Sequence, residues 1–126
     1  MTSRRAARRT ALELLYQWDL TGQPLVSLHG GDVDPFALEL AESVAAQAGE
    51  LDARITAVSD EWAADRLGVV ERNVLRMGLL ELERDDVPDA VAIDEAVSLA
   101  KRYASEDAGR LVNGILGRVA REARQT

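Results

Sequence analysis

Apolar residues recur at intervals of three and four along most of the chain, and this spacing permits one kind of secondary structure. Leu51, Ile55 and Val58 are one example, and a +4, +3 rhythm places such residues on one side of a helix. Strand signals are scarce, because no Asn-Gly turn links alternating β-branched runs and the chain has only five aromatic residues. The sequence therefore predicts an all-α protein.

Capping and helix-breaking residues divide the pattern into six helices. The first helix is predicted over 4–20, before a Gly-rich and Pro-containing loop at 21–34. The second is predicted from Asp34-Pro35 to 48, with Gly49 as terminator. The third is predicted along Leu51, Ile55, Val58 and Trp62 to near Gly68. The fourth is predicted along Val70, Val74, Met77 and Leu82 up to Val87-Pro88. The fifth is predicted over 89–104, and the sixth from Ser105 onward. Gly109, Gly114 and Gly117 lie inside the last pattern, which favours close helix packing there.

The length of 126 residues suits one compact domain. Loops are short, and neither internal repeats nor low-complexity tracts interrupt the helical pattern. We expect a compact helical bundle that forms a single domain over 1–126, with a flexible Arg-rich start at 1–5.

The first predicted helix opens with the cluster Arg4, Arg5, Arg8 and Arg9. Arginines four residues apart repel each other by roughly 0.2–0.5 kcal/mol, and cations in a first turn oppose the helix dipole. A local violation of this kind is typical of a functional site. The natural ligand for such a cluster is a polyanion.

Charge is distributed unevenly along a chain whose net charge is −7. Residues 1–18 carry four Arg and one Glu, residues 19–95 carry five Arg and 18 acids, and residues 96–126 carry six basic and three acidic residues. Both ends are basic around an acidic middle. If the ends meet in space, they form one basic face for a polyanion.

Catalytic chemistry has few candidates in this sequence. It contains no cysteine, its one histidine (His29) lies in the Gly-rich loop without a ligand set, and no serine has a base at a motif spacing. No apolar run approaches the ~18 residues that span a bilayer. We expect a cytoplasmic protein that is not an enzyme and needs neither metal nor cofactor.

Arg5, Arg9, Leu12 and Tyr16 follow one another at +4, +3 and +4, so the basic row continues into an aromatic residue. This combination suits single-stranded RNA, because phosphates meet guanidinium groups and a base stacks on the ring. The alternative is a solvated terminus, or arginines that pair with the protein's own acids. The role of Lys101 and Arg102 is likewise undecided, because they could belong to an RNA surface or to a solvated helix face.

Two stretches of the sequence match a known pattern. RRAARRTALELLYQWDLTG near the start and VERNVLRMGLLELERDDVPDAVAIDEAVSLAKRYASEDAGRLVNGILGRVA in the second half resemble the NusB transcription antitermination family. The resemblance covers roughly 4–20 and 70–120. It implies two packed three-helix bundles, with about six to seven helices in all.

The resemblance also implies a function and a site. Members of the family pair with NusE, a small-subunit ribosomal protein, and bind boxA RNA on nascent ribosomal RNA transcripts within the RNA polymerase elongation complex. The RNA-binding residues that it implies are Arg4, Arg5, Arg8, Arg9, Tyr16, Glu71, Tyr103, Asp107 and Arg110. Two positions depart from the family pattern, since Leu111 stands where phenylalanine is frequent and Gly109 where histidine is frequent.

Other functions remain open from the sequence. Ribosomal-RNA cytosine methyltransferases carry a NusB-like RNA-targeting module, but they continue into a cofactor-binding region with a catalytic cysteine, which these 126 residues lack. A protein-binding helical adaptor, in which the acidic middle docks a basic partner, is the other alternative. A homodimer that masks the first helix is a further hypothesis, because that helix carries apolar surface.

Overall fold

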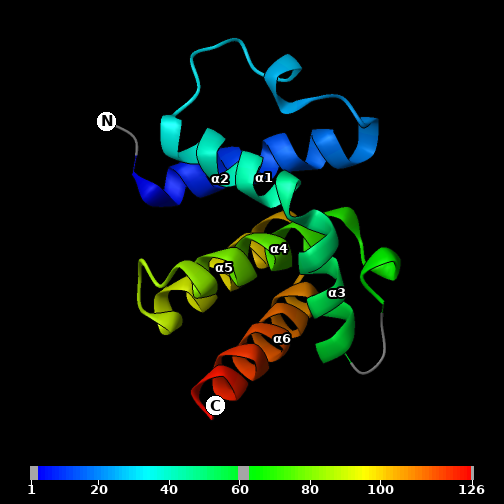
Figure 1. Ribbon diagram of the computed structural model, residues 1–126, viewed down its shortest axis with the longest axis vertical. Coiled ribbons are helices and arrows are strands. Elements are labelled where there is room, and N and C mark those ends of the chain that lie inside the picture. The colour runs from blue at the N-terminus through cyan, green and yellow to red at the C-terminus, as the bar shows by residue number, and fades with distance from the viewer. Residues whose placement is uncertain (1–2, 60–62, 126) are drawn as a thin grey trace.

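Six α-helices arranged in two groups make up the computed structural model, which describes residues 3–59 and 63–125 (Figure 1). They are α1 (Arg4–Thr21), α2 (Pro35–Ala46), α3 (Ala48–Val58), α4 (Val69–Arg84), α5 (Asp89–Tyr103) and α6 (Glu106–Arg124). Short 3-10 turns lie at Leu25–Ser27 and Ala64–Arg66. Within the described residues there is no strand. The all-α prediction is confirmed.

Local side-chain chemistry fixes most helix ends. Ser3, Asp34 and Ser105 each accept a hydrogen bond from the backbone N–H three residues further on, and so cap α1, α2 and α6. A cap of this kind stabilises a helix by about 1 kcal/mol. Gly22 ends α1 in the left-handed conformation, with a φ of 72°. Of the start predicted to be flexible, residues 3–5 form the cap and first turn of α1, while residues 1–2 lie outside the described part.

The boundary between the second and third helices differs from the prediction. The N–H of Gln47 bonds the carbonyls of Ser43 and Val44, which closes α2, and the chain enters α3 at Ala48. Gly49 is therefore a helical residue of α3 and not a terminator. Its φ is not positive, so nothing at this position uses the freedom of glycine to end a helix.

The third and fourth helices also end earlier than predicted. α3 stops at Val58, where Ser59 is extended, and Ala64 begins a separate 3-10 turn. The predicted stripe position Trp62 lies outside the described residues. α4 stops at Arg84, because Asp85 takes the left-handed conformation with a φ of 57°.

α4 is the central helix of the molecule. Every residue from Asn73 to Glu81 is buried, and α4 contacts each of the other five helices. α4, α5 and α6 pack against one another as one three-helix group. In the other group, α1 packs on α2, α2 packs on α3, and all three pack on α4 (Figure 1). The predicted arrangement of two packed groups of three helices is confirmed.

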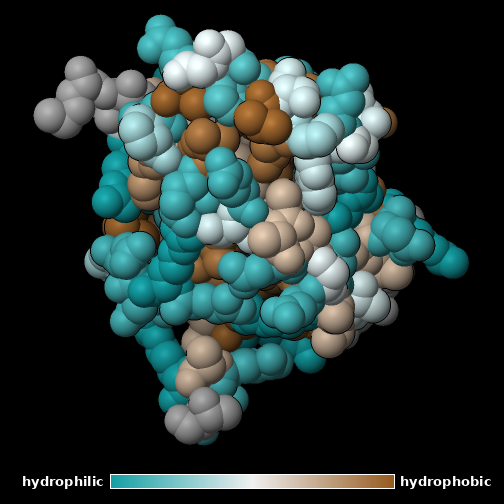
Figure 2. Space-filling model, turned by 45° about the horizontal axis from the view of Figure 1, so that its top comes forward, coloured by the Kyte–Doolittle hydropathy of each residue, from teal (hydrophilic) through white to brown (hydrophobic). Residues whose placement is uncertain are grey.

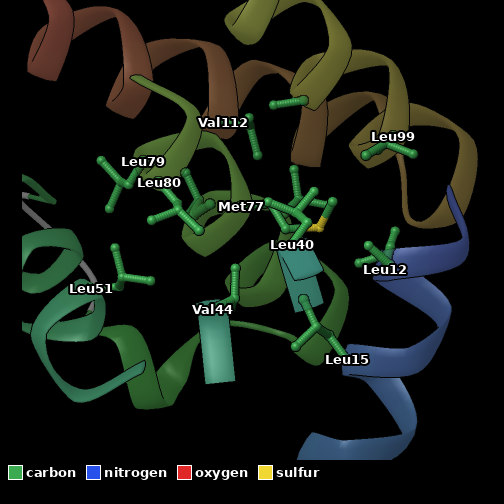
Figure 3. Close-up of a cluster of buried hydrophobic side chains, with 14 of the residues drawn as sticks. Leu12, Leu15, Leu40, Val44, Leu51, Met77, Leu79, Leu80, Leu99 and Val112 are labelled. Carbon is green, nitrogen blue, oxygen red and sulfur yellow. The ribbon is translucent and has the colours of Figure 1, made fainter. Parts of the chain in front are cut away.

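One hydrophobic core lies between the two groups of helices. Figure 3 shows side chains from all six helices converging on it. The labelled residues are Leu12, Leu15, Leu40, Val44, Leu51, Met77, Leu79, Leu80, Leu99 and Val112, and each is at most 6% exposed. Among residues 3–59 and 63–125, no helix has the length and apolar character needed to cross a membrane.

α4 and α6 pack closely at Gly78. A Cβ atom at Gly78 would lie 2.5 Å from Cδ1 of Leu116, which is fully buried. Gly114, inside the predicted packing pattern of α6, instead faces open space. Gly109 does lie against another helix, since a Cβ there would be 2.6 Å from Cγ of Lys101 on α5. The close packing of α4 on α6 depends on Gly78, which the sequence pattern did not indicate.

Substitution of Gly78 by Ala should destabilise the protein, although Ala is normally the better helix former. We expect a loss of about 1–3 kcal/mol, because the methyl group overpacks a filled core. Gly114→Ala is the matched control and should gain about 0.5–1 kcal/mol. Urea unfolding of both variants measures the two changes, and a stabilised Gly78→Ala variant would contradict this packing.

Candidate nucleic-acid interface

α1 and α5 border a groove that consists of two hollows. The arginine hollow is lined by Arg5, Arg9, Glu95, Ser98, Leu99 and Arg102. The tyrosine hollow is lined by Leu12, Glu13, Tyr16, Gln17, Val70 and Tyr103. Residue numbers rise in the same order along both helices, so α1 and α5 run in the same direction. We call the two hollows together the α1–α5 groove.

The four arginines of α1 have different surroundings. The guanidinium of Arg4 lies 4.4 Å from the ring centroid of Phe36 on α2. Arg5 donates to Glu95 of α5 at 2.9 Å, and this hydrogen bond raises the pKa of Arg5. Arg9 lines the arginine hollow and makes no ion pair within the described part of the chain. The repulsion expected within the cluster is thus relieved in part by the protein's own acids.

Arg8 points into the protein. It is 4% exposed and forms two hydrogen bonds of 2.8 Å to the carboxylate of Glu81 on α4. This contact raises the pKa of Arg8. Glu95 lies 4.0 Å from the same guanidinium. The family resemblance implies Arg8 as a phosphate contact, but in the structure its ion pair with Glu81 joins α1 to α4.

Arg102 is a groove residue that the sequence alone left undecided. It shares the arginine hollow with Arg9, and its guanidinium lies 5.7 Å from the ring centroid of Tyr103. Glu95, Ser98 and Arg102 are spaced +3 and +4, which places them on one side of α5. That spacing is the signal that could have assigned Arg102 and Ser98 to the site. The two basic ends of the chain meet at this hollow, as expected from the sequence.

The two tyrosines lie across the groove from each other. Tyr16 of α1 is 42% exposed and Tyr103 of α5 is 37% exposed, and both line the tyrosine hollow. Large aromatic side chains are usually more buried than this. An exposed ring next to guanidinium groups offers a stacking surface for a base.

The remaining candidate residues follow residues of the tyrosine hollow in the sequence. Glu71, in the first turn of α4, folds back over Gly68 next to the hollow residue Val70. Asp107 and Arg110, in the first turns of α6, form an exposed ion pair with each other. Asp107 follows Tyr103 closely across the turn between α5 and α6. These side chains border the groove and do not line it.

The two departures from the family pattern have structural counterparts. Leu111 is half-buried and packs against the core, so it is absent from both hollows. The side chain of Lys101 lies across Gly109, where a Cβ would be 2.6 Å from its Cγ. Neither position supplies an aromatic surface to the groove.

A model of the NusB family matches residues 5–121. The chain belongs to the NusB family. The transcription antitermination protein NusB of Solibacter usitatus is 37% identical over 133 aligned positions, which cover 97% of this chain and 91% of that protein. The family resemblance stated from the sequence is confirmed. Membership of a family of transcription antitermination proteins agrees with the expectation that the chain is not an enzyme.

Solved NusB structures share the fold. The structure of T. maritima NusB superimposes with a TM-score of 0.84 at 34% identity, covering 96% of this chain and 92% of that one. A chain from the crystal structure of NusB and NusE in complex with dsRNA gives a TM-score of 0.83 at 33% identity, covering 94% of this chain and 96% of that one.

Proposed function

We propose that this protein is a non-catalytic RNA-binding transcription antitermination factor that binds boxA RNA together with NusE. It acts as a single NusB-like domain in the cytoplasm, on nascent ribosomal RNA within the RNA polymerase elongation complex. Family membership supports the class of function, and the solved complex of NusB and NusE with dsRNA supports the pair of partners.

The α1–α5 groove is the observation that carries the proposal. It places arginines from α1 and α5 in line with two exposed tyrosines. Guanidinium groups bind phosphates of any sequence, and exposed rings stack on unpaired bases. Along α1 the distance from Arg5 to Tyr16 is about 16 Å, which suits an extended strand lying along the groove.

Each candidate residue has a role that follows from its surroundings. Arg9 and Arg5 contact phosphates, and Arg4 extends the basic surface towards α2. Tyr16 and Tyr103 stack on bases, while Asp107, Arg110 and Glu71 act at the margins. Because Arg8 is buried against Glu81, we assign it the positioning of α1 in place of direct contact with RNA.

Titration of labelled RNA tests the proposal. A boxA strand, a scrambled strand and a duplex are each titrated with the protein, with and without NusE. We expect the tightest binding for the boxA strand with NusE present, because bases specify and phosphates only position. Equal binding of the boxA and scrambled strands with NusE would contradict sequence-specific recognition. Preference for the duplex would contradict the single-strand proposal.

Self-association is a separate proposal that concerns the free protein. Tyr16, Leu20 and Val26 are 42%, 58% and 74% exposed. In Figure 2 the visible face is mostly hydrophilic, and its apolar side chains gather towards the top of the view. Burial of Tyr16 in a homodimer would cover one end of the groove. A constant monomer mass by light scattering over a concentration series would contradict it.

A further inference from the structure

The arginine hollow contains a charge imbalance that the ion pairs of α1 leave in place. Glu81 neutralises Arg8, and Glu95 neutralises Arg5. Within the described residues, Arg9 and Arg102 have no acidic partner, although they line the same hollow from two helices. Two cations held close together without an anion repel each other, and a bound anion reverses that effect.

We propose that the arginine hollow binds one phosphodiester group of the RNA strand, through Arg9 and Arg102 with the Ser98 hydroxyl as a further donor. This inference rests on the proposed function and gives roles to Ser98 and Arg102, two residues of α5 that the family resemblance does not include. Arginine suits this role because its planar fork donates two parallel hydrogen bonds to phosphate oxygens.

The surroundings of the hollow favour a bound phosphate. Leu99, which also lines it, is 6% exposed and supplies no carboxylate that could pair with Arg9 or Arg102. The carboxylate of Glu95 is held by Arg5 at 2.9 Å and lies 4.0 Å from Arg8. Its charge is thus shared by two arginines and does not cancel those of Arg9 and Arg102.

Arg102 also connects the two hollows. Its guanidinium lies 5.7 Å from the ring centroid of Tyr103, which lines the tyrosine hollow. A phosphate bound by Arg102 therefore lies beside the ring on which a neighbouring base stacks. The arrangement assigns backbone binding to one hollow and base stacking to the other.

The salt dependence of RNA binding tests this inference. Fluorescence anisotropy of a labelled boxA strand is recorded with the protein and NusE from about 50 to about 200 mM KCl. Arg102→Ala should weaken binding of boxA and scrambled strands by the same factor, and flatten the plot of log K against log[salt] by about 0.7 for the lost phosphate contact. Arg121→Ala, which removes an exposed arginine from the last turn of α6, is the matched control and should leave the slope unchanged.

A double variant shows whether one phosphate is shared. The combined loss in Arg9→Ala plus Arg102→Ala should be smaller than the product of the single losses, because both side chains act on one group. If Arg102→Ala retains the slope of Arg121→Ala while the wild type binds boxA, the inference is wrong and the proposed function stands. If the wild type with NusE binds no RNA, both are wrong. Saturable binding of inorganic phosphate that RNA does not displace would also overturn the inference.

Discussion

Replacement of Asp19 by Ala is expected to lower the free energy of unfolding by about 1–3 kcal/mol at pH 7. One oxygen of Asp19 accepts hydrogen bonds from Arg72 at 2.9 Å, Asn73 at 3.0 Å and Arg76 at 3.1 Å. Asn73 is fully buried and Arg76 is 5% exposed. Removal of the carboxylate leaves donors of Arg72, Asn73 and Arg76 without this acceptor, although Arg76 keeps its two hydrogen bonds of 2.7 Å to Asp52. Loss of a largely buried acceptor costs more than loss of a surface pair.

The effect of Asp19→Ala should depend on pH. Burial tends to raise the pKa of Asp19, but hydrogen bonds from Arg72 and Asn73, and the charges of Arg72 and Arg76, hold it below its ordinary value. The stabilisation is thus complete above about pH 5 and is lost as the pH falls through the unfolded pKa of about 3.9 and then the lower folded pKa. Urea unfolding at several pH values should show the difference from wild type shrinking in acid.

Glu122→Ala is the control for Asp19→Ala. Glu122 pairs with Arg118 on the surface of α6, and its side chain is 53% exposed. Exposed pairs contribute about 0–1 kcal/mol, so this variant should unfold almost as the wild type does. A loss in Asp19→Ala no larger than in the control would contradict the importance of the buried network.

Glu81→Ala is the second substitution with a large expected effect. It should cost about 3–5 kcal/mol, because Arg8 would stay buried with Glu95 at 4.0 Å as its nearest remaining carboxylate. The pair joins α1 to the central helix α4, so local loosening of α1 should appear as faster amide hydrogen exchange there. Thermal and urea unfolding measure the loss of stability.

Replacement of both partners separates the cost of an unpaired charge from the value of the pair. Arg8→Leu with Glu81→Leu leaves no buried charge at this contact, and such exchanges are often neutral or stabilising. We expect the double variant to be at least about 2 kcal/mol more stable than Glu81→Ala. It should also retain the salt dependence of RNA binding, since Arg8 positions α1 and does not contact phosphate. A flattened slope would place Arg8 in the RNA interface.

The helices were predictable where their signals are local. The caps Asp34 and Ser105 mark the starts of α2 and α6 in the sequence and in the structure alike. The helix end predicted at Gly49 was wrong, because the local sequence does not show whether a glycine will have a positive φ. The continuous burial of α4 from Asn73 to Glu81 was not predictable for another reason. Its polar side chains have partners far away in the sequence.

The sequence predicted which residues lie near the site, but not which neighbour each side chain contacts. Spacing placed Arg5, Arg9 and Tyr16 in one row, and the structure puts all three beside the α1–α5 groove. Adjacent residues on a helix differ by about 100° in direction, so Arg8 turns to Glu81 while Arg9 faces the groove. Which direction is buried depends on where α4 and α5 lie, and that is not encoded locally.

The central claim is that the α1–α5 groove is the RNA surface of this protein. NMR spectra of the isotope-labelled protein bound to NusE, recorded as a boxA strand is added, test it most directly. We predict that the signals shifted by RNA come from the groove residues Arg5, Arg9, Tyr16, Arg102 and Tyr103. Shifts confined to the α3–α6 side, around Arg54 and Val119, would contradict the claim.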